Sequence, residues 1–141
     1  MGDQEASLTL KIIAVFLVLF TLGTCAKADG ATVGEVIKDV PSIEKSIQKR
    51  LQLYPVELSY SIMTTSGEGA VGYAHEQMKG SPTSCNAFYD TASDLIVVPL
   101  DADEKILKHE IGHAIVDHYF KVPVPRWLHE TLAECAEEAT R

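Results

Sequence analysis

Two histidines four positions apart, His109 and His113, enclose Glu110 in a stretch, residues 104–120, that the sequence predicts to be helical. Residues four apart lie one above the other on the same face of a helix, so both imidazoles can bind a single metal ion. Glu110 is rotated by about 100° from His109 and is therefore expected beside the ion instead of on it. A carboxylate in that position can accept a proton from a water molecule that the ion holds. The pattern predicts two metal ligands and a general base.

A third ligand is expected further along the chain, because catalytic zinc usually has three protein ligands and leaves the fourth position to water. A second predicted helix begins after Pro125 and carries His129 and Glu130 side by side. Neighbouring residues on a helix point about 100° apart, so only one of the two can face the ion. Residue type and spacing leave both open.

The two segments together resemble the gluzincin clan of zinc metallopeptidases, the thermolysin-like or peptidase MA-like proteins. In that clan, a second helix carries the glutamate that completes the metal site, often within Trp-Leu-x-Glu-x-x-Ala, and residues 127–133 match this pattern. Thr131 stands where such proteins often have glycine. The resemblance implies Glu130 as the third ligand, one Zn²⁺ per chain as the cofactor, and a peptide or protein as the substrate.

Two acids are placed to orient the ligands, because a metal-bound histidine usually donates its other ring N–H to a carboxylate or carbonyl. Asp117 follows His113 by one helical turn, and Glu134 follows Glu130 by one turn. The resemblance favours Glu134, since the clan has an acid, usually aspartate, at that spacing.

Other polar residues near the motif have roles that the sequence leaves open. The metzincin pattern requires a histidine ten positions after His109, where this chain has Tyr119, so that alternative is excluded. A hydrolytic site also needs a donor to the developing oxyanion. The candidates for this donor are Tyr89, His118, Tyr119 and His129.

The chain before the motif predicts two helices and several strands. Residues 33–40 are compatible with a short helix, and residues 43–51, which Ser42 can cap, have an apolar side chain at every fourth position. Alternating apolar and polar side chains over residues 56–63 predict a half-buried strand, and a turn is expected to follow it. Residues 70–74 are compatible with a second short strand.

A β-hairpin is predicted immediately before the metal-binding helix. Residues 87–89 and 95–100 are apolar and flank a polar turn, whereas His75 falls in a polar stretch and is expected to be a solvated loop residue. The predicted fold class is α+β. The resemblance implies a minimal zincin-like domain with a small mixed or antiparallel sheet, an active-site helix and a C-terminal helix that carries the third ligand.

Gly112 lies inside the predicted metal-binding helix, where glycine costs about 1 kcal/mol relative to alanine. We therefore expect another backbone to approach closely at this position. The helix is expected to begin at Asp101 or Asp103, since either side chain can cap it and both favour the positive end of the helix dipole.

The first 28 residues are predicted to be a signal peptide. Lys11 precedes an apolar run over residues 12–20, and Ala26-Lys27-Ala28 has the small residues that signal peptidase recognises. The run is too short to cross a bilayer comfortably. We therefore expect a secreted or periplasmic domain spanning residues 29–141. A retained segment, or a lipid on Cys25, would instead attach the protein to a membrane.

Charge and cysteine content limit the partners of this domain. Its length suits one domain, and the net charge of -8 argues against nucleic acid or an acidic membrane surface as a partner. Cys85 and Cys135 remain after export and can form a disulfide in an oxidising compartment, although two unpaired thiols fit equally well.

Two classes of function remain. The first is an exported zinc peptidase with Glu110 as general base, which the presence of Glu110 favours because a structural site has no use for a base. The second is a non-catalytic zinc-binding module that acts in recognition or as a subunit of a larger assembly. The small size favours this second class, unless a partner subunit completes the cleft.

Overall fold

A computed structural model describes residues 31–81 and 83–141 of the chain. The predicted signal peptide, residues 1–28 with Cys25, lies outside the described residues, as do the first two positions of the predicted domain. Within the part of the chain that the structure describes, none of the helices is long and apolar enough to cross a membrane.

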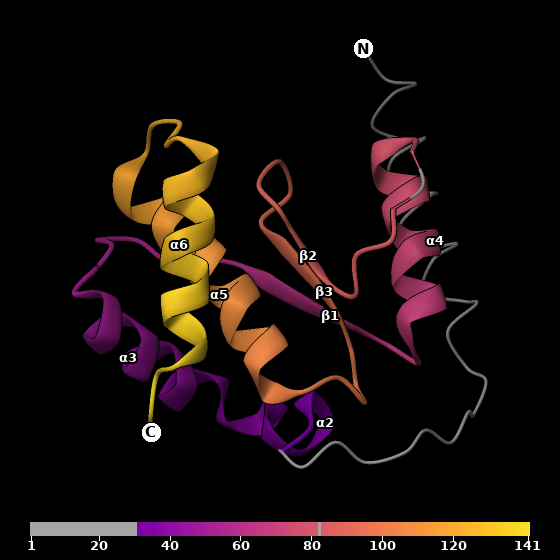
Figure 1. Ribbon diagram of the computed structural model, residues 1–141, viewed down its shortest axis with the longest axis horizontal. Helices are drawn as coiled ribbons and strands as arrows, with labels where there is room; N and C mark the ends of the chain where they lie inside the picture. Colours follow the sequence, from indigo (N-terminus) through magenta and orange to yellow (C-terminus); the bar gives the residue numbers. More distant parts are fainter. Residues whose placement is uncertain (1–30, 82) are drawn as a thin grey trace.

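The protein has an α+β fold, as the sequence predicts, in which helices lie on both sides of a small sheet (Figure 1). In chain order the elements are α2 (Val33–Val36), the 3-10 helix η1 (Ile37–Asp39), α3 (Val40–Leu51), β1 (Ser61–Thr65), α4 (Glu68–Lys79), β2 (Phe88–Asp90), β3 (Leu95–Pro99), α5 (Glu104–Phe120) and α6 (Arg126–Glu137). Helices α3, α5 and α6 lie together on one side of the strands, and α4 lies on the other.

The sheet is mixed and has the strand order β1-β3-β2. Strand β1 pairs with β3 in parallel, and β2 pairs with β3 antiparallel, so the predicted hairpin is confirmed. The central strand β3 alternates its faces. Ile96 and Val98 point into the cluster shared with α3 and α5, while Val97 packs with Met63 and Val71 on the α4 side.

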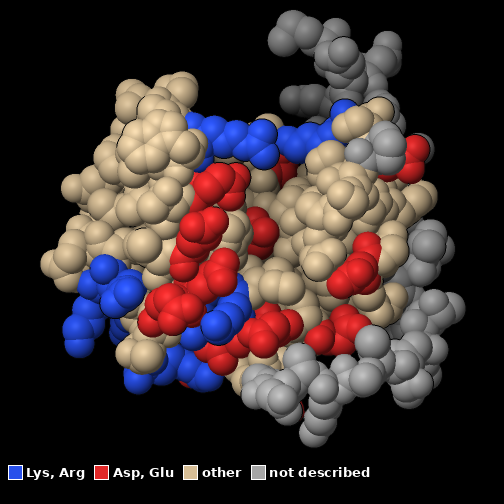
Figure 2. Space-filling view, in the orientation of Figure 1, with Lys and Arg blue, Asp and Glu red and all other residues tan. Residues whose placement is uncertain are grey.

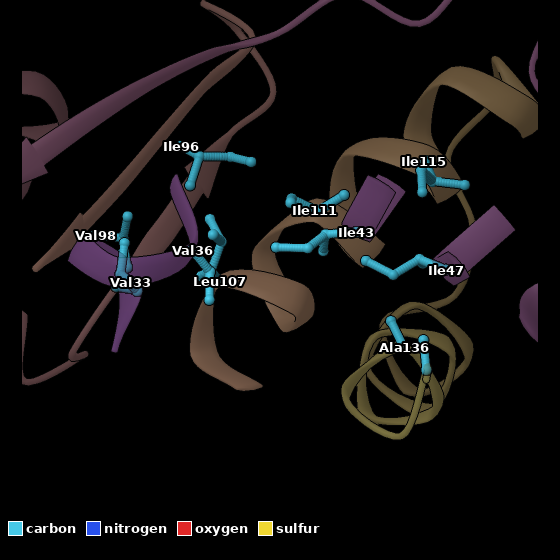
Figure 3. Close-up of a cluster of buried hydrophobic side chains, with 12 residues drawn as sticks. Val33, Val36, Ile43, Ile47, Ile96, Val98, Leu107, Ile111, Ile115 and Ala136 are labelled. Carbon is cyan, nitrogen blue, oxygen red and sulfur yellow. The ribbon is translucent and has the colours of Figure 1, made fainter. Parts of the chain in front are cut away.

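The main core lies between the sheet and the helices α3, α5 and α6 (Figure 3). Helix α5 contributes an apolar side chain once per turn, and α3 contributes two fully buried isoleucines. These residues are Leu107, Ile111, Ile115, Ile43 and Ile47. The core therefore fixes α5, the helix with the metal-binding motif, against both the sheet and α3.

Helix α5 has the bounds that the sequence predicts, and two local features explain them. Asp103 caps the helix by accepting a hydrogen bond from the backbone N–H of Lys105, at 2.8 Å. A Cβ atom on Gly112 would lie 2.8 Å from Cβ of Ala136 and 3.1 Å from Cα of Ala133. The predicted close approach is thus confirmed, and the neighbouring backbone is that of α6.

The short strand predicted at residues 70–74 is wrong, because these residues lie within α4. Two glycines weaken the helical signal locally, but Val71 and Ala74, three positions apart, share one face of the helix and are both buried against the sheet. His75 is correspondingly a helical residue and not a loop residue, with its ring 5.1 Å from that of Phe88, edge to face. Tertiary burial decides the structure of this segment.

Two other predicted boundaries differ from the structure. Helix α3 begins at Val40 with Pro41 in its first turn, so Ser42 lies inside the helix and does not cap it. The strand predicted at residues 56–63 begins only at Ser61, and Val56 is 93% exposed. The alternating pattern therefore extends beyond the residues that have a strand partner.

Candidate metal centre

Three predicted ligands from two helices converge on one point. His109 and His113 lie one turn apart on α5, and Glu130 lies on α6. The contact at Gly112 allows the two helices to approach closely enough for a side chain of α6 to reach the histidines of α5. His109, His113 and Glu130 can each offer one ligand atom within 4.8 Å of the others.

The distances between these donor atoms fit a tetrahedral metal ion. Nε2 of His109 lies 3.0 Å from Nε2 of His113, and Oε2 of Glu130 lies 3.6 Å from the first and 3.7 Å from the second. Zinc bonds of about 2.0 to 2.1 Å in tetrahedral geometry separate two donor atoms by about 3.3 Å. Two imidazoles and one carboxylate are also a donor set that zinc accepts.

The environment of the ligands favours the protonation states that metal binding needs. The pKa of His113 is lowered to about 3, mainly by burial and further by the neighbouring His109 and His129, so its imidazole is neutral at neutral pH. The Glu130 side chain is 44% exposed. One side of the donor group is therefore open to solvent and to a ligand.

Each histidine uses its second ring nitrogen for a contact with α6. Nδ1 of His109 lies 2.8 Å from Oε1 of Glu137, and Nδ1 of His113 lies 2.6 Å from Nδ1 of His129. When both Nε2 atoms face an ion, both Nδ1 atoms carry the proton and donate it. Glu137 and His129 are then the acceptors.

The residues predicted to orient the histidines are not the ones in contact with them. Glu134 is exposed on α6, and Glu137, one turn further on, has the contact with His109 instead. Asp117 accepts a hydrogen bond from the hydroxyl of Tyr89 at 3.4 Å, while the Nδ1 atom of His113 contacts His129. The rotation of α6 about its own axis, which local spacing does not specify, decides which acid faces α5.

Glu110 lies beside the donor group and is almost fully buried, with 7% of its surface exposed. Its pKa is raised to about 7, chiefly by burial and also by the charge of Glu130, although His109 and a hydrogen bond from the backbone N–H of Tyr89 act in the opposite direction. Tyr89 lies on β2, which is an edge strand of the sheet. The edge strand and the predicted base are therefore in direct contact.

A pocket of about 400 Å³ lies next to this centre. Its walls come from residues 84–87, which lead into β2, from the α5 residues His109 and Glu110, and from Glu137. Acidic side chains gather on the same face of the molecule, near the middle of the view in Figure 2. A ligand in this pocket would touch a predicted metal ligand and the predicted base together.

A second polar cluster lies at the other end of α5 and does not contain the metal ligands. The hydroxyl of Tyr89 donates to Asp94 at 2.8 Å, and Nε2 of His118 lies 3.0 Å from the same carboxylate. Asp94, Asp117 and His118 line a separate pocket of about 300 Å³. His118, Tyr89 and Asp117 thus form a network that joins the hairpin to α5.

The two cysteines of the described chain are both free. Cys85 is half-buried and packs beside Met63 and Val71, whereas Cys135 is exposed on α6. The disulfide considered for these residues is not formed.

Sequence reasoning missed Glu137 and the contact of His129 with His113. Both are polar residues of the predicted second helix: Glu137 lies two turns after Glu130, and His129 lies immediately before it.

No protein-family model, no curated protein and no solved structure gives a significant match to this chain.

Proposed function

We propose that the protein is a zinc-dependent peptidase that hydrolyses peptide bonds with Glu110 as general base. The observation that carries the proposal is the buried carboxylate of Glu110 beside three convergent donor atoms. A purely structural metal site needs the donor atoms alone. A buried carboxylate next to them is costly to fold and has a use in catalysis.

His109, His113 and Glu130 would hold the ion through Nε2, Nε2 and Oε2. Zinc bound there supplies a Lewis acid that polarises a peptide carbonyl and makes a water molecule more acidic. Glu137 and His129 would keep the two imidazoles in the tautomer whose Nε2 lone pairs face the ion.

Glu110 suits the role of a proton carrier at neutral pH, because its pKa is raised to about 7, first of all by burial. A divalent cation nearby would favour its ionised form. The carboxylate would then take a proton from the attacking water and give it to the nitrogen of the leaving amine. The N–H of Tyr89 would hold the carboxylate in place during both transfers.

Strand β2 is the element best placed to bind a peptide. It is an edge strand, it contacts Glu110 through Tyr89, and it follows the chain segment that lines the adjacent pocket. Edge strands bind extended peptides through main-chain hydrogen bonds, which suit a range of side chains. The resemblance to gluzincins implies the same arrangement.

The test is the substitution Glu110→Gln. We expect unchanged zinc content and melting temperature, and a rate of peptide hydrolysis lower by about 10² to 10⁴, because the amide cannot accept the proton. Glu134→Gln, on the exposed part of α6, is the matched control and should hydrolyse peptides like the wild type. Loss of zinc together with activity in Glu110→Gln would make Glu110 a ligand and contradict the proposal.

The second candidate is a non-catalytic zinc-binding module. The observation in its favour is the exposure of Glu130, since no other segment of the described chain covers that side of the donor group. The outcome that selects this candidate is a zinc-loaded wild type that hydrolyses nothing in a broad peptide library, even with candidate partner proteins added.

We also propose that the protein is exported and that its signal peptide is removed after Ala28. Mass spectrometry of the protein recovered from its producing cell should then show Asp29 as the first residue. An intact N-terminus in the membrane fraction, or a lipid on Cys25, would contradict this proposal.

A further inference from the structure

Tyr89 contacts helix α5 at two points, one through its backbone and one through its side chain. Its backbone N–H, on the edge strand β2, donates a hydrogen bond to the carboxylate of Glu110. Its hydroxyl has a single proton, which it shares between Asp94 at 2.8 Å and Asp117 at 3.4 Å. One residue therefore links the predicted base to a second acid of the same helix.

The spacing of Glu110 and Asp117 along α5 makes this double contact possible. Seven residues are close to two helical turns, so both acids lie on one face of the helix, about 10.5 Å apart along its axis. Strand β2 lies alongside α5 (Figure 1). The Tyr89 side chain therefore runs along the helix from Glu110 toward Asp117.

The main acceptor of the hydroxyl, Asp94, is itself held by neighbouring groups. Nε2 of His118 lies 3.0 Å from the same carboxylate oxygen, and the carbonyl of Asp94 accepts a hydrogen bond from the N–H of Ser61 at 2.8 Å. Burial raises the pKa of Tyr89, and Asp94 and Asp117 raise it further, so the hydroxyl keeps its proton and remains a donor. Its contacts thus fix the β2–β3 hairpin against the C-terminal half of α5.

Strand β2 alone does not fix the N–H of Tyr89. The strand has only the residues Phe88–Asp90, and within the described chain it pairs with β3 only. Alternate residues of an antiparallel strand turn their N–H groups away from the neighbouring strand, and Tyr89 is one of these, because its N–H donates to Glu110. The distance from this donor to the carboxylate therefore depends on how the hairpin lies against α5.

We propose that the hydroxyl of Tyr89 positions the general base. By anchoring the hairpin to Asp94 and Asp117, it keeps the N–H of the same residue at the carboxylate of Glu110. This inference rests on the proposed function, in which Glu110 transfers the proton. Tyr89 is a positioning residue, because its hydroxyl is turned to acids that line a pocket apart from the metal ligands.

The substitution Tyr89→Phe tests the proposal, because it removes the hydroxyl and keeps the ring. We expect an unchanged zinc content and a rate of peptide hydrolysis lower by about 10- to 100-fold, since a displacement of about 1 Å can cost 100-fold. The matched control is Tyr60→Phe. The hydroxyl of Tyr60 donates to Glu44 of α3 at 3.0 Å, and burial raises its pKa in the same way, but it has no contact with the candidate site. Tyr60→Phe should hydrolyse peptides like the wild type, and equal rates for the two variants would overturn the proposal.

The double variant Tyr89→Phe with Glu110→Gln separates positioning from a general structural effect. If the hydroxyl acts through Glu110, its loss has no further consequence once the base is removed. We therefore expect the double variant to hydrolyse peptides within about twofold of Glu110→Gln alone. A further loss of about tenfold would mean that Tyr89 acts on the fold or on substrate binding, and would overturn the proposal.

Hydrogen exchange tests the same contact without any measurement of activity. The carboxylate of Glu110 protects the N–H of Tyr89, which faces away from β3. In the zinc-loaded chain, we expect the N–H at position 89 to exchange about tenfold faster in Tyr89→Phe than in the wild type or in Tyr60→Phe, as for one lost hydrogen bond. Unchanged exchange in Tyr89→Phe would overturn the proposal. The expected exchange in a wild type that hydrolyses no peptide would contradict the proposed function alone and support the positioning of the carboxylate.

Discussion

The Nδ1 atom of His109 on α5 lies 2.8 Å from Oε1 of Glu137 on α6. The carboxylate is thus behind the imidazole, on the side opposite to the Nε2 atom that faces His113. A hydrogen bond of this kind fixes both the tautomer and the orientation of a ligand histidine, and it makes the ligand more basic.

The first prediction is that Glu137 supports metal binding and that Glu134 does not. Glu137→Ala should lower the zinc affinity by about 10- to 100-fold, which is typical for loss of an acceptor behind a ligand histidine. Glu134→Ala is the matched control, one turn away on the same helix and exposed. Competition with a chromophoric chelator measures both affinities, and equal values for the two variants would show that the contact with His109 has no orienting role.

The second prediction separates Glu130 from its neighbour His129. Glu130→Ala removes a donor atom of the site and should reduce zinc affinity by more than 100-fold. His129→Gln keeps an acceptor for the Nδ1 proton of His113, so a loss of tenfold or less is expected. The same chelator competition decides between them. If His129→Gln loses more zinc than Glu130→Ala does, the third ligand is His129.

The third prediction concerns acid stability at the junction of α4 and β2. Asp90 is buried at the end of β2, and although burial acts to raise its pKa, the hydrogen bonds from Lys79 and Ser93 outweigh this effect and lower the pKa. A carboxyl group whose pKa is lower in the folded state stabilises the protein above its unfolded pKa of about 3.9. That contribution is lost as the pH falls through the folded pKa.

Asp90→Asn should therefore lower the free energy of unfolding at pH 7 by about 1 to 2 kcal/mol. The difference from the wild type should be constant from pH 7 to about pH 5 and should shrink as the pH falls below about 4. Urea titrations at several pH values measure it, with Asp101→Asn, an exposed acid, as the control. A difference that grows on acidification would contradict the assigned direction of the pKa shift.

The parts of the fold that the sequence predicts well are those with local determinants. Helix α5 combines a capping Asp103 with an apolar side chain on every turn, and the hairpin of β2 and β3 has two apolar runs around a polar turn. Helix α4 has no such agreement between its signals, since two glycines interrupt it, although its buried Val71 and Ala74 have helical spacing. Only contact with the sheet selects the helix.

In the candidate site too, the residues that local spacing determines can be predicted, and those that depend on packing between helices cannot. His109, His113 and Glu110 follow from spacing along one helix, and Glu130 from the resemblance of a second segment. The acid behind His109 depends on how α6 is rotated against α5, a property of the packing between two helices. Spacing within α6 therefore pointed to Glu134, whereas packing brings Glu137 into contact.

The last prediction tests that packing directly. A Cβ at position 112 would lie 2.8 Å from Cβ of Ala136 and 3.1 Å from Cα of Ala133, so Gly112→Ala must push α6 away from α5. Overpacking of this kind costs about 1 to 3 kcal/mol, which exceeds the gain in helix propensity of about 1 kcal/mol everywhere except at the lower end of that range. Because the 3.1 Å contact is to backbone, which cannot turn aside, we expect the upper end and a net loss of stability.

The matched control for Gly112→Ala is Gly72→Ala in α4, where a new Cβ would meet only the carbonyl oxygen of Thr83, at 3.6 Å. This substitution should be neutral or should stabilise the protein by up to about 1 kcal/mol. Displacement of α6 also moves Glu130 away from the histidines, so Gly112→Ala should lose zinc affinity as well as stability, whereas Gly72→Ala should lose neither. Urea unfolding and chelator competition measure the two effects, and a Gly112→Ala protein as stable and as zinc-avid as the wild type would show that α5 and α6 do not pack as closely as described.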